Sequence, residues 1–220
     1  MIQIAGVLDY REAAMILDCG ATHVGLPLRL PDGREDVDET TARAIVAALP
    51  RQCTVLITYQ TVAREIVAFA DFLGVQAVQL HGSISREQME KLRSTRPQWF
   101  LLKTLVVHPD RTDNVVIQSR EFAPLVDAFL TDTFDPATGR RGATGRTHDW
   151  RISRALVEAS GVPVVLAGGL TPDNVGEAIR AVQPWGIDAH TGVEDDRGRK
   201  DRTKVKRFVE EFSRWRAASG

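Results

Sequence analysis

PVVLAGGLTPDN, residues 163–174, joins an apolar run, two glycines and a helix start. The apolar run has the length of a buried strand. Thr171 followed by Pro172 is typical of the first turn of a helix, because a hydroxyl caps free N–H groups and proline fits the first helical position. The stretch therefore predicts a strand that leads through a glycine turn into a helix.

The same alternation of strand and helix recurs along the chain. Segments of helical period are expected at 40–49, 62–73, 86–93, 152–160, 172–181 and 203–215, and Ser85 is the expected N-cap of the third. Segment 107–123 fits either a helix or an extended piece. Eight short apolar or β-branched runs are the expected strands, at 2–7, 23–26, 54–58, 77–80, 100–106, 128–131, 163–167 and 186–189.

Strands that alternate with helices form parallel sheets. No linker or low-complexity tract divides the chain, so we expect one α/β domain over residues 1–220. Eight βα units in this length predict a single (β/α)₈ TIM barrel. An open doubly wound sheet is the alternative, although no G-x-G-x-x-G follows the first expected strand.

Composition and charge narrow the class of partner. The chain has 28 Lys and Arg against 29 Asp and Glu, a net charge of −1 that does not favour nucleic acid. No apolar run of about 18 residues predicts a membrane span, and the first residues lack the features of a signal peptide. Cys19 and Cys53 have no zinc-site spacing. We expect a cytoplasmic protein that binds a phosphorylated small molecule, without metal or cofactor; its oligomeric state stays open.

Glycine turns follow the seventh and eighth expected strands. Glycine lets the backbone approach a ligand, and helix N-termini attract anions. Turns after these two strands form the usual phosphate site of a TIM barrel. We therefore predict that phosphate binds at Gly168, Gly169, Thr191 and Gly192.

Three residues outside these turns are candidates for chemistry or for ligand contact. Asp132 follows the sixth expected strand, where partial burial at the barrel mouth suits a general acid or base. His81 ends the fourth strand and either orients a ligand or bonds to backbone. Gly145, in the glycine-rich loop after Asp132, is expected to contact the ligand.

Several motifs in order resemble the phosphoribosylanthranilate isomerase family: QLHG at 79–82, GATG at 142–145, AGGLTPDNV at 167–175, GID at 186–188 and TGVE at 191–194. The resemblance covers nearly the whole chain. It implies a TIM barrel that opens a phosphorylated ribosylamine and moves a proton from its C2 atom. In that family a cysteine of the first strand is the base and an aspartate of the sixth strand is the acid; Asp132 matches the acid.

The chain departs from the family pattern at the base. The family motif Lys-Ile-Cys-Gly is here Gln3-Ile4-Ala5-Gly6, and alanine accepts no proton. Loss of a positioned base costs about 10²- to 10⁴-fold in rate. The candidate replacement is His190, and Arg34 is an approximate counterpart of the arginine that binds the substrate carboxylate.

Two functions follow from these observations. The first is a phosphosugar isomerase that works by acid/base proton transfer, with an altered substrate or reduced native activity. The alternative is a catalytically silent phosphosugar-binding or regulatory barrel, which the alanine at position 5 favours.

Overall fold

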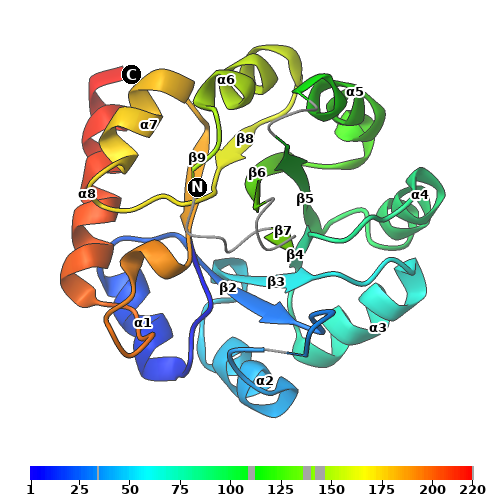
Figure 1. The fold of residues 1–220 in the computed structure, drawn as a ribbon. Helices are drawn as coiled ribbons and strands as arrows, with labels where there is room; N and C mark the ends of the chain where they lie inside the picture. The colour runs from blue at the N-terminus through cyan, green and yellow to red at the C-terminus, as the bar shows by residue number, and fades with distance from the viewer. Residues whose placement is uncertain (34, 109–111, 136–139, 142–146, 220) are drawn as a thin grey trace.

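A computed structural model describes residues 1–33, 35–108, 112–135, 140–141 and 147–219. Eight parallel strands close into a barrel, and helices surround it (Figure 1). Closure occurs because the first strand pairs with the last as well as with the second. The barrel strands are β1 (Ile2–Ala5), β2 (His23–Leu28), β3 (Thr54–Thr58), β4 (Ala77–Leu80), β5 (Phe100–Val107), β6 (Ala128–Asp135), β8 (Val164–Leu166) and β9 (Gly186–Ala189).

The helices pack their apolar faces on the outside of the barrel. Ile66, Leu156 and Phe208 are fully buried examples from three of them. Three short 3₁₀ helices lie at Arg51–Cys53, Ala123–Leu125 and Thr191–Val193. The α-helices are α1 (Tyr10–Asp18), α2 (Glu39–Ala48), α3 (Ala63–Leu73), α4 (Arg86–Thr95), α5 (Thr112–Phe122), α6 (Trp150–Ala159), α7 (Val175–Val182) and α8 (Arg202–Ser219).

Alternation along each strand decides which side chains enter the barrel. Side chains two residues apart point to the same side of a strand. Leu102 and Leu130 belong to a small apolar cluster inside the barrel, so Thr104 and Asp132, two residues further on, point inward as well. The C-terminal positions of this inward set form the base of the cavity described below.

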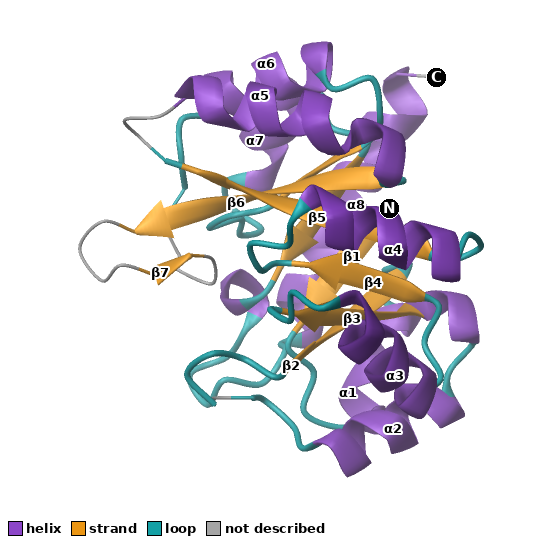
Figure 2. Ribbon diagram, turned by 90° about the vertical axis from the view of Figure 1, so that its right-hand side faces the viewer, coloured by secondary structure: helices purple, strands orange, loops and turns teal. Residues whose placement is uncertain are grey.

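The structure confirms the predicted TIM barrel and extends one strand beyond its predicted end. Strand β6 continues to Asp135, beyond the predicted end at residue 131, because it pairs with the antiparallel strand β7 (Arg140–Arg141; Figure 2). The segment left open, 107–123, contains helix α5.

Helix α7 begins at Val175 rather than at Pro172. The Thr171 hydroxyl accepts from the backbone N–H groups of Asp173 and Asn174, so this threonine caps a turn that precedes the helix. The Ser85 hydroxyl accepts from the Gln88 N–H at 3.3 Å, which confirms Ser85 as the N-cap of α4.

No helix among the described residues combines the length and the apolar character needed to cross a membrane.

The packing of α3 generates a stability prediction. Ile66→Ala removes a side chain that is 0% exposed, so it is expected to lower the free energy of unfolding by about 2–5 kcal/mol. The matched change Ile117→Ala, at a side chain 61% exposed on α5, is expected to cost less than about 0.5 kcal/mol. Urea denaturation of both variants measures the difference, and equal losses would contradict the core assignment.

Candidate active site

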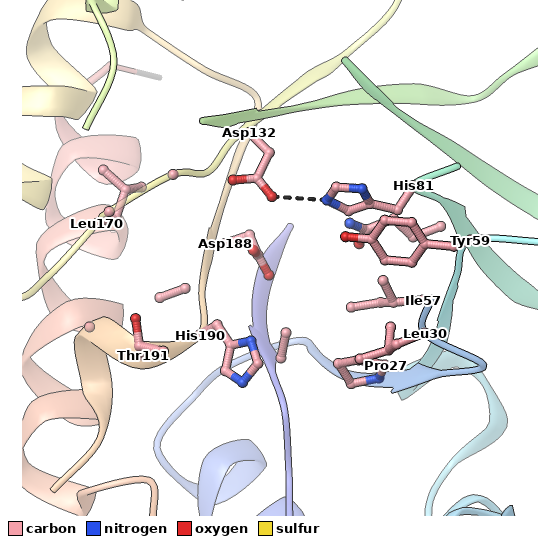
Figure 3. A pocket seen from close by; sticks show the side chains of 16 residues that line it. Pro27, Leu30, Ile57, Tyr59, His81, Asp132, Leu170, Asp188, His190 and Thr191 are labelled. Atoms are coloured by element: carbon pink, nitrogen blue, oxygen red, sulfur yellow. Dashed lines mark hydrogen bonds and ion pairs between the residues drawn. The ribbon is translucent and has the colours of Figure 1, made fainter. Parts of the chain in front are cut away.

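A cavity of about 720 Å³, including its open mouth, lies at the C-terminal ends of the strands. Side chains from six strands and the loops that follow them surround it (Figure 3). This is the end of the barrel where TIM-barrel enzymes carry their active sites. The lining residues are Ala5, Pro27, Leu30, Ile57, Tyr59, Gln79, His81, Asp132, Gly168, Gly169, Leu170, Asp188, Ala189, His190, Thr191 and Gly192.

Asp132 and His81 form a buried pair at one side of the cavity. His81 Nε2 lies 3.0 Å from Asp132 Oδ2, and the Thr133 N–H donates to Asp132 Oδ1 at 2.7 Å (Figure 3). The His81 ring stacks on Tyr59, with ring centroids 4.5 Å apart. These contacts hold the Asp132 carboxyl in one orientation toward the cavity.

His81 has one ring nitrogen without a partner among the described residues. The Nδ1 atom is buried and forms no hydrogen bond with any described residue. The sequence left two roles open for His81, and the structure places its other nitrogen on Asp132 rather than on backbone. Its side chain therefore contributes to the position of the carboxyl group.

His190 lies across the cavity from Tyr59 (Figure 3) and against Gly6, the residue that follows β1. A Cβ atom on Gly6 would fall 2.0 Å from His190 Nε2, so the imidazole occupies space that only glycine leaves open. Nε2 lies 3.7 Å from both Asp36 Oδ2 and Glu194 Oε1. Burial lowers the pKa of His190 to about 4, and the Lys200 ammonium acts in the same direction. The ring is neutral at pH 7 and a weak base.

The four residues predicted to bind phosphate border this same cavity. Gly168 and Gly169 adopt φ values of +95° and +64°, the left-handed region that favours glycine. The two turns touch, because a Cβ atom on Gly192 would lie 1.9 Å from the Leu170 carbonyl oxygen. The fold thus brings together turns that are more than twenty residues apart in the chain.

Two of the sequence-predicted binding residues, Arg34 and Gly145, lie outside the described residues. Sequence reasoning also missed three polar side chains that line the cavity: Tyr59, Gln79 and Asp188. The signal that points to such residues is the alternation of side chains along a strand. Gln79 lies two residues before His81 and therefore points to the same side. The pairing of β1 with β9 places Asp188 beside Gln3.

His148 forms a hydrogen bond at each of its two ring nitrogens. Nδ1 lies 2.9 Å from Thr133 Oγ1, and Nε2 lies 2.6 Å from Ser153 Oγ. Burial lowers the pKa of His148 to about 4. These contacts join β6 to α6. His148 therefore helps to hold this helix against the strand that carries Asp132.

Fold and site together define a class: a (β/α)₈ barrel with a carboxylate–histidine pair and two glycine turns around one cavity. A family model described as N-(5′-phosphoribosyl)anthranilate (PRA) isomerase matches residues 2–211. N-(5′-phosphoribosyl)anthranilate isomerase 2 of Methanosarcina mazei is 40% identical, over 94% of this chain and 92% of that protein. The chain belongs to the phosphoribosylanthranilate isomerase family, whose members are aldose–ketose isomerases.

Solved structures agree with this assignment. Phosphoribosyl anthranilate isomerase from Thermotoga maritima superposes with a TM-score of 0.80 and 27% identity, covering 96% of this chain and 98% of that one. A second match is a phosphoribosyl anthranilate isomerase in complex with reduced 1-(o-carboxyphenylamino)-1-deoxyribulose 5-phosphate. Its TM-score is 0.77 at 25% identity, with 96% and 97% of the two chains covered. The resemblance noted in the sequence is thereby confirmed.

The partly buried histidines His148 and His190 generate a pH prediction. His148 has a folded pKa of about 4 against about 6.5 in an unfolded chain, so below pH 6.5 the unfolded state binds more protons. Its contribution to stability is complete above about pH 6.5 and is lost as the pH falls toward 4. The advantage of wild type over His148→Gln in the free energy of unfolding should therefore shrink across this range.

Histidine NMR signals and urea denaturation between pH 7 and pH 4 provide the measurement. Signals of His148 and His190 that titrate near pH 6.5 would show that neither ring is buried as described.

Proposed function

We propose that this chain catalyses the rearrangement of N-(5′-phosphoribosyl)anthranilate to the corresponding 1-amino-1-deoxyribulose phosphate. The observation that carries the proposal is the pair of Asp132 and His81, which faces a cavity bordered on its other side by two glycine turns. The identity of 40% with a protein named for this reaction supports the choice of substrate.

Asp132 is the proposed general acid. The ribose ring opens when its ring oxygen gains a proton while the amine lone pair forms a C1=N bond. A carboxylic acid at the mouth of the barrel suits this step, because partial burial and fixed geometry favour proton transfer to a bound ligand. His81 positions the carboxyl group through the 3.0 Å contact between Nε2 and Oδ2.

The phosphate is proposed to bind at Gly168, Gly169, Thr191 and Gly192. Both turns border the cavity and are closely packed, Gly192 against the Leu170 carbonyl and Gly168 against the Thr133 side chain. Backbone N–H groups of such turns favour an anion without any basic side chain. This arrangement supports binding of a phosphomonoester at the end of the cavity opposite His81.

One observation favours the second candidate, a silent phosphosugar-binding barrel. Ala5 lines the cavity at the position where the family has its proton-abstracting cysteine. The two candidates differ in turnover and agree in binding, so kinetics on phosphoribosylanthranilate decide between them. Turnover in the ordinary enzyme range is on the order of 1 to 10³ per second.

Asp132→Asn tests the proposed acid. The amide keeps the shape of the side chain but supplies no acidic proton, so kcat is expected to fall by about 10²- to 10⁴-fold. Asp71→Asn, which removes an exposed carboxylate on α3, is the matched control and should keep wild-type turnover. Steady-state kinetics on purified variants give the result, and an Asp132→Asn enzyme with unaltered kcat would refute the assignment.

Phosphate recognition has its own test. Isothermal titration should show ribose 5-phosphate binding at least about tenfold more tightly than ribose, because charge-assisted hydrogen bonds contribute about 1.5–3 kcal/mol each. Gly192→Ala should abolish the difference, since its Cβ atom would collide with the Leu170 carbonyl oxygen at 1.9 Å. Equal affinities for the two sugars in the wild type would show that the glycine turns bind no phosphate.

A further inference from the structure

Asp188 is an acidic side chain inside the barrel to which the sequence assigned no role. It lies on β9, where its backbone pairs in parallel register with Gln3 of β1. Its side chain lines the cavity, and Figure 3 shows it between Asp132 and His190. Asp188 therefore stands beside the strand whose family cysteine is here Ala5.

The surroundings of Asp188 are unusual for a structural carboxyl group. The residue is 8% exposed, and its Oδ1 atom is buried with no hydrogen-bond partner among the described residues. A buried carboxyl oxygen without a donor costs stability, and such groups concentrate at functional sites. Asp188 forms no ion pair within the described part of the chain that would account for its burial.

Charged groups from several elements act on Asp188. Burial raises its pKa to about 7, and the negative charge of Asp132 on β6 adds to that rise. The Gln3 amide on β1 and the Lys200 ammonium before α8 act against it. Neutral His190 at the end of β9 contributes no charge at pH 7. A carboxyl group with a pKa near the working pH is suited to accept and return a proton.

The other candidates for the base are weaker. Ala5 has no proton-accepting atom. His190 has a pKa of about 4, so its ring accepts a proton far less readily than Asp188 does. Nε2 of His190 lies against Gly6 at the rim, with Asp36 and Glu194 each 3.7 Å away. These observations favour Asp188 over His190, the replacement base expected from the sequence.

We propose that Asp188 is the general base that removes the C2 proton of the substrate, in the role that Ala5 leaves unfilled. This inference rests on the proposed function. It makes Asp132, on β6, and Asp188, on β9, the acid and the base of one cavity.

The proton transfers balance over the cycle. Asp132 gives its proton to the ring oxygen as the C1–O bond breaks and the nitrogen lone pair forms C1=N. The Asp188 carboxylate then takes the C2 proton; the C–H electrons form C1=C2, and the C=N electrons return to nitrogen. Finally Asp188 returns a proton to C1 while the C2 hydroxyl gives its proton to Asp132. The ketone is formed, and both carboxyl groups regain their starting states.

Asp188→Asn is the direct test, because the amide preserves the shape but accepts no proton. We expect kcat on phosphoribosylanthranilate to fall by about 10²- to 10⁴-fold, with affinity for ribose 5-phosphate nearly unchanged. Substrate deuterated at C2 should show a larger isotope effect in the variant than in the wild type. The acid limb of the kcat/KM profile, which reports ionisation of the base, should disappear.

Rescue separates chemistry from structure. Ala5→Cys introduced into Asp188→Asn places a thiol at the end of β1. The double variant should have a kcat at least about tenfold higher than that of Asp188→Asn alone. The matched variant Asp36→Asn removes the carboxylate near His190 instead, and it should reduce kcat far less than Asp188→Asn. A loss in Asp36→Asn equal to that in Asp188→Asn would return the base to His190 and overturn the inference.

Different results would overturn the proposed function and the assignment of Asp188 as the base. A wild type without turnover on phosphoribosylanthranilate overturns the proposed function, and the base assignment falls with it. An active wild type whose Asp188→Asn form keeps its kcat and its acid limb overturns only the base assignment. A misfolded Asp188→Asn protein is detected by its unfolding curve; the double variant, if folded and still inactive, also counts against the inference.

Discussion

Pairing between β1 and β9 closes the barrel, and the site depends on this closure. The backbone register joins Gln3 to Asp188 and Ile4 to Ala189, so two segments from opposite ends of the sequence become neighbours. Because side chains alternate along a strand, this one register turns Ala5 and Asp188 toward the same cavity. A shift by one residue would point Asp188 into the apolar layer beneath the helices.

The interior of the barrel is polar just below the cavity. The Gln3 amide donates to Gln79 Oε1 at 2.8 Å, and the Gln79 amide donates to Thr104 Oγ1 at 3.2 Å. This network nevertheless leaves Gln3 Oε1 without a partner among the described residues, as it does Asp188 Oδ1. Burial of unpaired polar atoms opposes folding, and the apolar packing around the barrel offsets that cost. The same burial raises the pKa of Asp188.

Two glycines beside the cavity, Gly6 and Gly192, lie so close to neighbouring atoms that no side chain would fit at either position. At Gly6 a side chain would occupy the position of the His190 ring, and at Gly192 it would enter the Leu170 carbonyl. The first contact fixes the imidazole at the rim, where burial keeps it neutral at pH 7. The second joins the turns after β8 and β9 into one continuous border of the cavity. Both constraints are steric, and they act between strands rather than along one.

The sequence by itself determined the alternation of strands and helices, the barrel, the glycine turns and the place of Asp132, because strand length, helical period and turn chemistry are local properties. It also showed that Ala5 stands where its family has a cysteine. Only the tertiary structure decided that His81 contacts Asp132, 51 residues away, and that Asp188 shares their cavity. It also decided that the pKa of His190 is lowered whereas the pKa of Asp188 is raised. The physical reason is that burial and nearby charge, which set these pKa values, come from residues that only closure of the barrel brings together.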